Sequence, residues 1–308
     1  MQQSAHNILS PLPDSEQYLL VNLLSKQADL LDAQEAELLK SGAVPDGSEW
    51  ISKGYVVDPA EEAQRFKRAY LDSLDARDTD EVQLFYVGSY ACNFDCSYCY
   101  QTEYEAPSQS EQDAVQAAFF AYVDQTFAGR RKYVTLFGGE PLLPGPGARR
   151  LVEQMVEGTR ARGLDLAVVT NGYHLASYVP LLSQGNIREV QVTLDGPAPV
   201  HDARRYLIGG APTFASIVEG IDAALAAGLA INLRSVLDRD NLEAFDELAA
   251  FARSKGWTSH PRFKTQIGRN YELHVCQTDR QRLYSRLELF QDLYGVLRRH
   301  PEVLEFHR

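Results

Sequence analysis

The sequence has no long apolar run. No segment of its 308 residues approaches the roughly 18 consecutive apolar residues that a membrane-spanning helix needs. The N-terminus, MQQSAHNILSPLPDSEQ, has neither the basic flank nor the apolar core of a secretion signal. We therefore expect a cytoplasmic protein with no membrane partner. In that reducing compartment, clustered cysteines more often bind metal or do chemistry than form disulfides.

Positive charge is also scarce. The chain has 30 Lys and Arg against 42 Asp and Glu, a formal net charge of -12. Nucleic acid binding needs a basic surface, so we expect no nucleic acid partner. Residues 1–81 hold 16 acidic and 7 basic residues, whereas the remaining 227 residues carry only -3. This asymmetry predicts two regions, 1–80 and 81–308. The acidic region fits either a solvated surface or a surface for a basic peptide.

The first region reads as small and mixed in secondary structure. Residues 15–42 show a short apolar run and then a helical pattern that stops at Gly42. Residues 50–58 are expected to form a strand or turn, and a charged helix is expected near 59–76. The polar stretch DARDTDE, residues 75–81, is expected to connect this region to the next.

From Glu81 onward, apolar segments alternate with helical patterns. Strands are expected at 81–89, 132–139, 164–172, 188–196, 229–238 and 261–268. Helices are expected near 110–128, 147–163, 174–184, 213–228, 241–255 and 278–299. This alternation predicts an α/β fold with a parallel sheet and right-handed crossovers. Several strands are apolar almost throughout, as strands covered on both faces are. The six units make a partial barrel or a doubly wound sheet.

Cysteine is concentrated in one place. Of the four cysteines, Cys92, Cys96 and Cys99 fall within the eight residues CNFDCSYC. A mononuclear zinc site normally takes four ligands, and the fourth is missing nearby. Distant candidates for a fourth ligand are His201, His274 and Cys276. A 4Fe-4S cubane usually takes one cysteine per iron, so three cysteines would leave one iron open to a substrate or cofactor.

Glycine and polar residues collect where the expected strands end. The cysteines follow the first strand, GGEP ends the second, TNG the third and TLDGP the fourth. Catalytic groups in parallel α/β folds lie at the carboxyl ends of strands. We therefore expect these four strand ends to form one pocket.

At this point the sequence resembles the radical S-adenosylmethionine (SAM) enzymes. Their signature is C-x3-C-x2-C after the first strand of a partial (β/α)6 barrel, with an aromatic residue before the last cysteine; here that residue is Tyr98. The resemblance covers roughly residues 81–270. It implies that Cys92, Cys96 and Cys99 hold one 4Fe-4S cluster and that SAM binds the open iron. Reductive cleavage of SAM then gives a 5′-deoxyadenosyl radical that abstracts a hydrogen atom from the substrate.

Two further motifs extend the resemblance to SAM binding. FGGEP, residues 137–141, is similar to the family motif that receives the SAM amino group. Gly138 and Gly139 would let the backbone approach a ligand closely, and Glu140 or nearby carbonyls would accept from the ammonium. Asn171, in VTNG, stands at the matching end of the third strand.

The stretch VTLDGP…HDARR resembles the SLDGP…HD…R pattern of the peptide- and protein-modifying branch. Thr193 takes the place of the usual serine and would face the ribose or carboxylate of SAM. The resemblance implies that Asp195 lines the pocket. It also implies that Arg204 pairs with the SAM carboxylate, a task suited to a guanidinium fork.

The resemblance implies a peptide or protein substrate and an electron donor such as a flavodoxin or ferredoxin. Many relatives carry a cysteine-rich C-terminal domain with auxiliary clusters; no such domain is recognisable here, because no cysteine follows Cys276. The region 1–80 would hold a leader peptide or cap the barrel. Two alternatives stay open: a small-molecule enzyme on the same core, and a non-catalytic peptide-binding or zinc-binding protein on the same fold.

Overall fold

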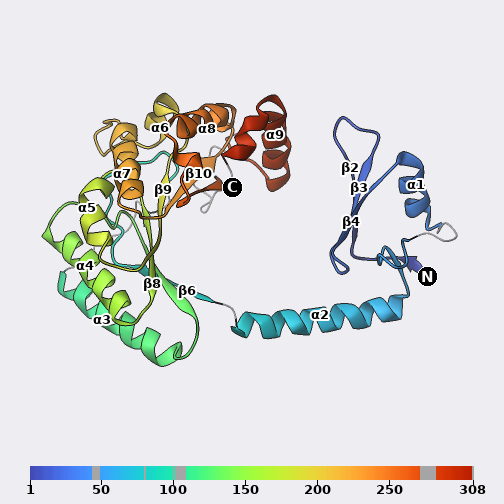
Figure 1. Ribbon diagram of the computed structural model, residues 1–308, viewed down its shortest axis with the longest axis horizontal. Coiled ribbons are helices and arrows are strands. Elements are labelled where there is room, and N and C mark those ends of the chain that lie inside the picture. Colours follow the sequence, from blue (N-terminus) through green and yellow to red (C-terminus); the bar gives the residue numbers. More distant parts are fainter. Residues whose placement is uncertain (44–48, 80, 100, 102–108, 271–281, 307–308) are drawn as a thin grey trace. The chain divides into compact units, whose positions relative to one another are not determined.

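The computed structural model describes residues 1–43, 49–79, 81–99, 101, 109–270 and 282–306 (Figure 1). Two residues named above as distant metal ligands, His274 and Cys276, lie outside the described residues. The chain divides into two compact units, Met1–Asp80 and Glu81–Arg308. Each unit is described by itself below.

In its described residues, the N-terminal unit combines two small antiparallel sheets with two helices. The elements are β1 (Gln2–Gln3), β2 (Asn7–Pro11), β3 (Tyr18–Asn22), β4 (Gln27–Leu31), α1 (Ala33–Ser41), β5 (Val56–Val57) and α2 (Pro59–Thr79). Strands pair in the order β2-β3-β4, and β1 pairs with β5. The core of this unit comprises Leu20, Leu31, Leu39, Trp50, Tyr55 and Val56.

The structure corrects two expectations for this unit. The stretch 15–42 contains β3 and β4 before its helix, α1, begins at Ala33. The helix does stop at Gly42, whose φ of 76° ends it in the left-handed region that glycine tolerates. The polar stretch 75–81 is not a connector over its whole length, because α2 continues to Thr79.

The second unit contains one six-stranded sheet, and the expected partial barrel is confirmed. Its strands are β6 (Val82–Val87), β7 (Lys132–Phe137), β8 (Asp165–Thr170), β9 (Ile187–Thr193), β10 (Ile231–Leu237) and β11 (Phe263–Arg269). They lie side by side in chain order, and every neighbouring pair is parallel. This sequential order is what repeated right-handed β-α-β crossovers produce.

The helices of this unit follow the strands. They are α3 (Gln109–Thr126), α4 (Pro146–Ala161), α5 (Leu175–Leu182), α6 (Ala198–Arg204), α7 (Phe214–Ala226), α8 (Phe245–Ser254) and α9 (Arg286–Arg299). Short 3₁₀ turns lie at η1 (Leu242–Ala244), η2 (Trp257–Ser259) and η3 (Pro301–Glu305). The short helix α6, which carries most of the HDARR stretch, was not expected from the sequence. Within the described residues, the last helix begins at Arg286 rather than near 278.

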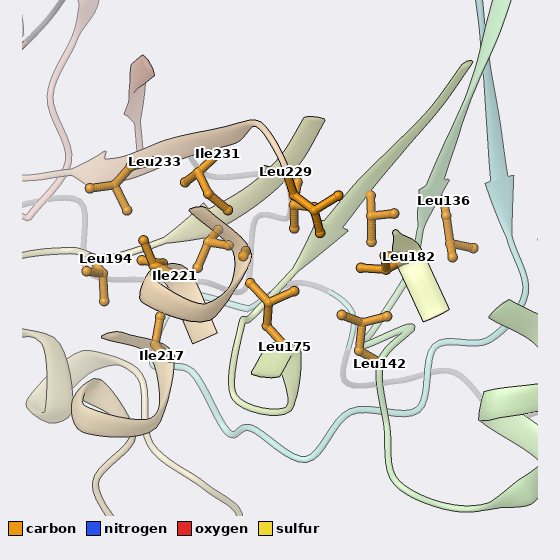
Figure 2. Close-up of a cluster of buried hydrophobic side chains, with 14 of the residues drawn as sticks. Leu136, Leu142, Leu175, Leu182, Leu194, Ile217, Ile221, Leu229, Ile231 and Leu233 are labelled. Atoms are coloured by element: carbon orange, nitrogen blue, oxygen red, sulfur yellow. The ribbon is translucent and has the colours of Figure 1, made fainter. Parts of the chain in front are cut away.

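The two faces of the sheet differ in polarity. Figure 2 shows Leu136 of β7, Ile231 and Leu233 of β10, and Ile217 and Ile221 of α7 in one cluster of buried side chains between the sheet and the helices. On the other face, alternate residues of the same strands line a cavity instead, and many of these are polar. The expectation of apolar strands covered on both faces is therefore wrong for the inner face.

No helix in the described parts of the chain is long and apolar enough to cross a membrane.

Candidate active site

A cavity of about 930 Å³ lies on the inner face of the six-stranded sheet and reaches the loops that follow the strands. Eight of the eleven residues expected at the site line it: Cys92, Cys96, Tyr98, Cys99, Gly138, Gly139, Asn171 and Thr193. The other three, Glu140, Asp195 and Arg204, are not among its lining residues. The four strand ends singled out from the sequence therefore meet at one cavity.

The cysteine loop follows β6 and is held largely by backbone hydrogen bonds. The N–H of Cys99 donates to the carbonyl of Cys96 at 3.0 Å, which closes a tight turn between them. Two sulfurs accept backbone N–H groups: Cys92 Sγ accepts from Phe94 and Cys99 Sγ from Gln101, each at 3.4 Å. None of the three cysteines forms a disulfide. Burial raises the pKa of the Cys92 thiol to about 11 and also raises the pKa of Cys96.

The two glycines of GGEP are needed because the cysteine loop crosses them. The N–H of Gly139 donates to the Ser89 carbonyl at 3.0 Å, and the N–H of Glu140 donates to the Ala91 carbonyl at 2.9 Å. A Cβ on Gly139 would lie 2.3 Å from the carbonyl oxygen of Ala91, far inside van der Waals contact. A Cβ on Gly138, whose φ is 147°, would lie equally close to the Ser89 oxygen, at 2.3 Å. The sequence predicted that a ligand approaches the backbone closely at Gly138 and Gly139. In the structure, the backbone of the cysteine loop makes a close approach to these glycines.

Glu140 ties the end of β7 to the end of β8. Its buried carboxylate accepts from Thr170 Oγ1 at 2.6 Å, from the N–H of Asn171 at 2.5 Å and from the N–H of Leu142 at 2.7 Å. Burial raises the pKa of Glu140 to about 7, although the three donors oppose that rise. The carboxylate thus accepts hydrogen bonds from three groups of the protein. These bonds give Glu140 a structural role at the ends of the two strands.

Asn171 connects the end of β8 to the cysteine loop. Its side-chain amide donates to Asn93 Oδ1 at 2.8 Å and lies 3.9 Å from Cys92 Sγ. Its own Oδ1 accepts from the N–H of Tyr173 at 2.9 Å. Thr193, the last residue of β9, lies on the cavity wall two residues before Asp195.

Tyr98 joins the cysteine loop to the end of β9. Its hydroxyl donates to Asp195 Oδ2 at 2.6 Å and accepts from Arg205 Nη1 at 2.7 Å. The other Asp195 oxygen accepts from the N–H of Val236 on β10 at 2.9 Å. Asp195 therefore fixes the tyrosine and β10 at the same time, without facing the cavity.

The adjacent residues Arg204 and Arg205 have different surroundings. Arg204 donates to both oxygens of Asp238, at 2.8 and 3.0 Å, and lies 3.5 Å from Asp195. Its side chain is only 5% exposed, so its guanidinium makes its bonds inside the protein. Arg205 lines the cavity beside Tyr98, and its Nε is buried without a hydrogen-bond partner among the described residues.

A family model settles the identity of this arrangement. The model of the radical SAM superfamily matches residues 86–252, which is 167 of the 308 residues. The chain belongs to the radical SAM superfamily. Members of this superfamily use a 4Fe-4S cluster and SAM, and these are the cofactors of this radical SAM protein.

Curated relatives match the same kind of core. The protein is 30% identical over 170 residues to a GTP 3′,8-cyclase of Campylobacter fetus, covering 54% of this chain and 50% of that one. It is 35% identical over 172 residues to a GTP 3′,8-cyclase of Acidothermus cellulolyticus, covering 54% and 46%. The chain thus spans about half the length of the curated relatives it matches.

Solved structures share the fold at low sequence identity. Native anSMEcpe with bound AdoMet matches with a TM-score of 0.59 and 18% identity, covering 74% of this chain and 63% of that one. SuiB of Streptococcus suis matches with a TM-score of 0.55 and 13% identity, covering 97% and 69%. At such identities the likeness shows the fold alone.

The residues at the site fit a cluster better than a single ion. Within the described ranges, no three His, Cys, Asp or Glu side chains gather closely enough to hold one metal ion. His201, an expected zinc candidate, is buried between the N–H of Asp195 at 3.3 Å and Thr213 Oγ1 at 3.1 Å. Thiolates that each take a different iron do not need to converge on one point. Backbone N–H groups aimed at two of the sulfurs suit ligands that become negatively charged.

Two features of the cavity were missed by reasoning from the sequence. Arg205 was passed over for Arg204, although both stand in HDARR. The inner face of the strands, with Gln191, Arg234 and Gln266, was not proposed at all. The signal was present in part: VQVT (190–193) and INLR (231–234) alternate apolar and polar residues with the period of a strand.

Proposed function

We propose that this radical SAM protein cleaves SAM reductively and uses the reaction to abstract a hydrogen atom from a substrate in the cavity. The observation that carries the proposal is the placement of Cys92, Cys96 and Cys99 together on the wall of one cavity at the carboxyl ends of the sheet. Each thiolate would hold one iron, which leaves one iron open for SAM. When bound, the cluster supplies the electron for cleavage; we propose a flavodoxin or ferredoxin as its donor.

We assign the SAM carboxylate to Arg205 rather than Arg204. Arg205 lines the cavity and has an unengaged Nε, whereas the fork of Arg204 is taken by Asp238. The hydroxyl of Thr193 and the amide of Asn171 lie on the same wall and remain our proposed contacts for the rest of SAM. Tyr98 would orient Arg205 through their 2.7 Å hydrogen bond.

Apolar side chains contribute to the cavity lining beside its polar groups. Phe85 and Phe137 line the cavity with their rings edge to face at 6.1 Å, and Phe94 and Ile208 lie on the lining as well. These surfaces would contact the apolar part of a substrate.

We propose a peptide or protein side chain as the first candidate substrate. Structures similar to this chain include anSMEcpe with a bound Kp18Cys peptide and SuiB with its precursor peptide SuiA. The SuiB match covers 97% of this chain, so it extends over the N-terminal unit. That unit has a three-stranded sheet with β2 and β4 at its edges, and an extended peptide can add to such an edge. Capping of the barrel is the other role open to the unit.

A small molecule is the second candidate, favoured by the curated relatives named GTP 3′,8-cyclase. Their match covers 54% of this chain, about the share that the superfamily model also covers. A match of that extent supports the shared SAM chemistry more strongly than a shared substrate.

The test is cleavage of SAM by anaerobically reconstituted, chemically reduced protein, read as 5′-deoxyadenosine by mass spectrometry. Wild type should contain about four irons per chain and cleave SAM. Cys96→Ala should lose both, because one iron loses its ligand. Cys276→Ser, which changes the one cysteine outside the motif, is the matched control and should retain both.

A Cys96→Ala protein that still cleaves SAM contradicts the proposal, as does a colourless wild-type protein without iron. Incubation with candidate peptides and with GTP then separates the two substrate classes.

A further inference from the structure

Arg234 stands in the middle of β10, on the inner face of the sheet, and lines the cavity. It pairs in register with Thr193 of β9 and Gln266 of β11. It therefore lies on a strand, level with Thr193, the last residue of β9.

The guanidinium of Arg234 has no anionic partner in the described part of the chain. Its Nε is buried and makes no hydrogen bond there. The acidic residue on the same inner face, Glu189, is engaged by Lys264 at 2.5 Å and by Asn232 at 3.1 Å. Arg234 as a whole is half-buried and lines the cavity, so its guanidinium is within reach of an anion that enters the cavity.

The neighbouring strand is shaped to receive this arginine. Gly268 of β11 has no Cβ, and a Cβ there would lie 3.0 Å from both Nε and Nη2 of Arg234. Its absence lets the guanidinium lie against the β11 backbone. Gln191, in register with Asn232, and Gln266, in register with Arg234, bond to each other across β10 at 2.7 Å. The guanidinium thus lies against the β11 backbone, beside a pair of glutamines that bond to each other.

The charge of the cavity lining points the same way. Among the described residues that line it, the cationic ones are Arg205, Arg234 and Arg269 and the acidic ones are Asp95 and Glu189. Without the three cysteines, which become negatively charged as cluster ligands, this balance is +1, whereas the whole chain carries -12. Away from the cysteines, the lining is therefore more favourable to an anion than the protein as a whole.

We propose that Arg234 anchors an oxyanion of the substrate, a carboxylate or a phosphate, within the barrel. This inference rests on the proposed function, because it assumes that SAM occupies the rim beside Arg205. SAM has a single carboxylate, which we assign to Arg205, so Arg234 is left for the other reactant. The planar fork of arginine fits both kinds of oxyanion.

The experiment measures anion binding by the full-length chain, independently of turnover. Wild type is titrated with malonate and, separately, with inorganic phosphate, at constant ionic strength made up with chloride. The midpoint of thermal unfolding reports binding, because a ligand of the native state raises it. The variants are Arg234→Gln, Arg234→Lys and the control Arg262→Gln, which removes an exposed arginine that precedes β11.

At least one anion should raise the midpoint of wild type. Arg234→Gln should weaken that binding about ten- to hundredfold, Arg234→Lys less, and Arg262→Gln should match wild type. A response to malonate supports an acidic peptide, and a response to phosphate supports a phosphorylated small molecule. Equal responses in wild type and Arg234→Gln overturn the inference.

A separate arm measures the affinity for SAM. If Arg234→Gln binds SAM about tenfold more weakly than wild type, the arginine serves SAM and the inference falls. If wild type fails to cleave SAM but binds anions through Arg234, the proposed function falls and the anion site stands.

Discussion

The residues that frame the cavity and the arginines that face it use polar groups in opposite ways. Glu140, Asp195 and Arg204 do not line the cavity, and their polar groups are engaged by the protein. Arg205 and Arg234 line it, and each has a buried Nε with no partner among the described residues. The difference teaches that the framing residues hold the site in place, whereas the cavity-facing arginines can bind something further. Substitutions should therefore cost stability in the frame and binding at the cavity-facing arginines.

The largest effect is expected at Arg204. Arg204→Gln leaves the carboxylates of Asp195 and Asp238 buried without their shared cation. Breaking a buried ion pair by removing one partner costs about 3–5 kcal/mol of the free energy of unfolding. Chemical denaturation of the full-length chain measures this loss.

The adjacent Arg205→Gln is the matched variant. It should cost only about 1 kcal/mol of stability, since one hydrogen bond to Tyr98 is lost. It should instead weaken SAM binding about tenfold or more. If Arg205→Gln shows the larger loss of stability and Arg204→Gln the weaker SAM binding, the assignment of the two arginines is wrong.

A somewhat smaller effect is expected at Gly139. Gly139→Ala places a Cβ 2.3 Å from the carbonyl oxygens of Tyr90 and Ala91, so the cysteine loop must move. Overpacking against backbone should cost about 3 kcal/mol, and iron content after reconstitution should fall with it. Iron analysis and denaturation measure the two quantities.

The control for this glycine is Gly295→Ala in α9. There a new Cβ would meet the flexible end of Arg299 at 3.5 Å, an ordinary van der Waals contact. Replacing glycine by alanine inside a helix stabilises by about 0.5–1 kcal/mol. A Gly139→Ala protein with normal iron content would show that the loop does not depend on this contact.

The smallest effect is a pH dependence at His201. Thr213 Oγ1 donates to the Arg205 carbonyl, so His201 Nε2–H donates to Thr213 and Nδ1 accepts from the N–H of Asp195. Burial, with Arg205 and Arg204 nearby, lowers the pKa of His201 to about 3, against 6.5 when unfolded; Asp202 opposes the shift. The stability that the neutral ring provides is present above pH 6.5 and is lost as the pH falls towards 3.

His201→Gln removes this titration while keeping polar atoms at the position. Between pH 6.5 and pH 5 the wild-type apoprotein should lose about 2 kcal/mol more stability than the variant. Identical pH profiles would show that the ring is not held neutral by its surroundings.

The fold of the second unit could be predicted because the sequence pattern of a strand followed by a helix is local and is repeated along the unit. Each strand and helix shows its own apolar pattern, and the order of elements then determines a parallel sheet. The N-terminal unit was harder, since β3 and β4 are five residues each and join a helix without a clear break in pattern. Neither strand is long enough for alternation to stand out.

Only part of the site could be predicted, and for a physical reason. A motif identifies which residues lie at a strand end but not which way adjacent side chains point. Arg204 and Arg205 differ by one step at the end of α6, and that step separates the protein interior from the cavity. Arg234 was missed because a polar residue inside a strand gives no motif; its setting is revealed only by the register with Gln266 and by its proximity to Gly268.

The backbone contacts between the cysteine loop and the GGE turn have a consequence for protein engineering. Main-chain N–H groups of Gly139 and Glu140 donate to the carbonyls of Ser89 and Ala91, so these two bonds do not depend on which side chains stand at 89 and 91. The cysteine loop and the GGE turn therefore have to be transferred together. A cluster-binding module grafted onto another parallel sheet would have to carry both segments from neighbouring strands, while the side chains at 89 and 91 could be redesigned to suit the new host.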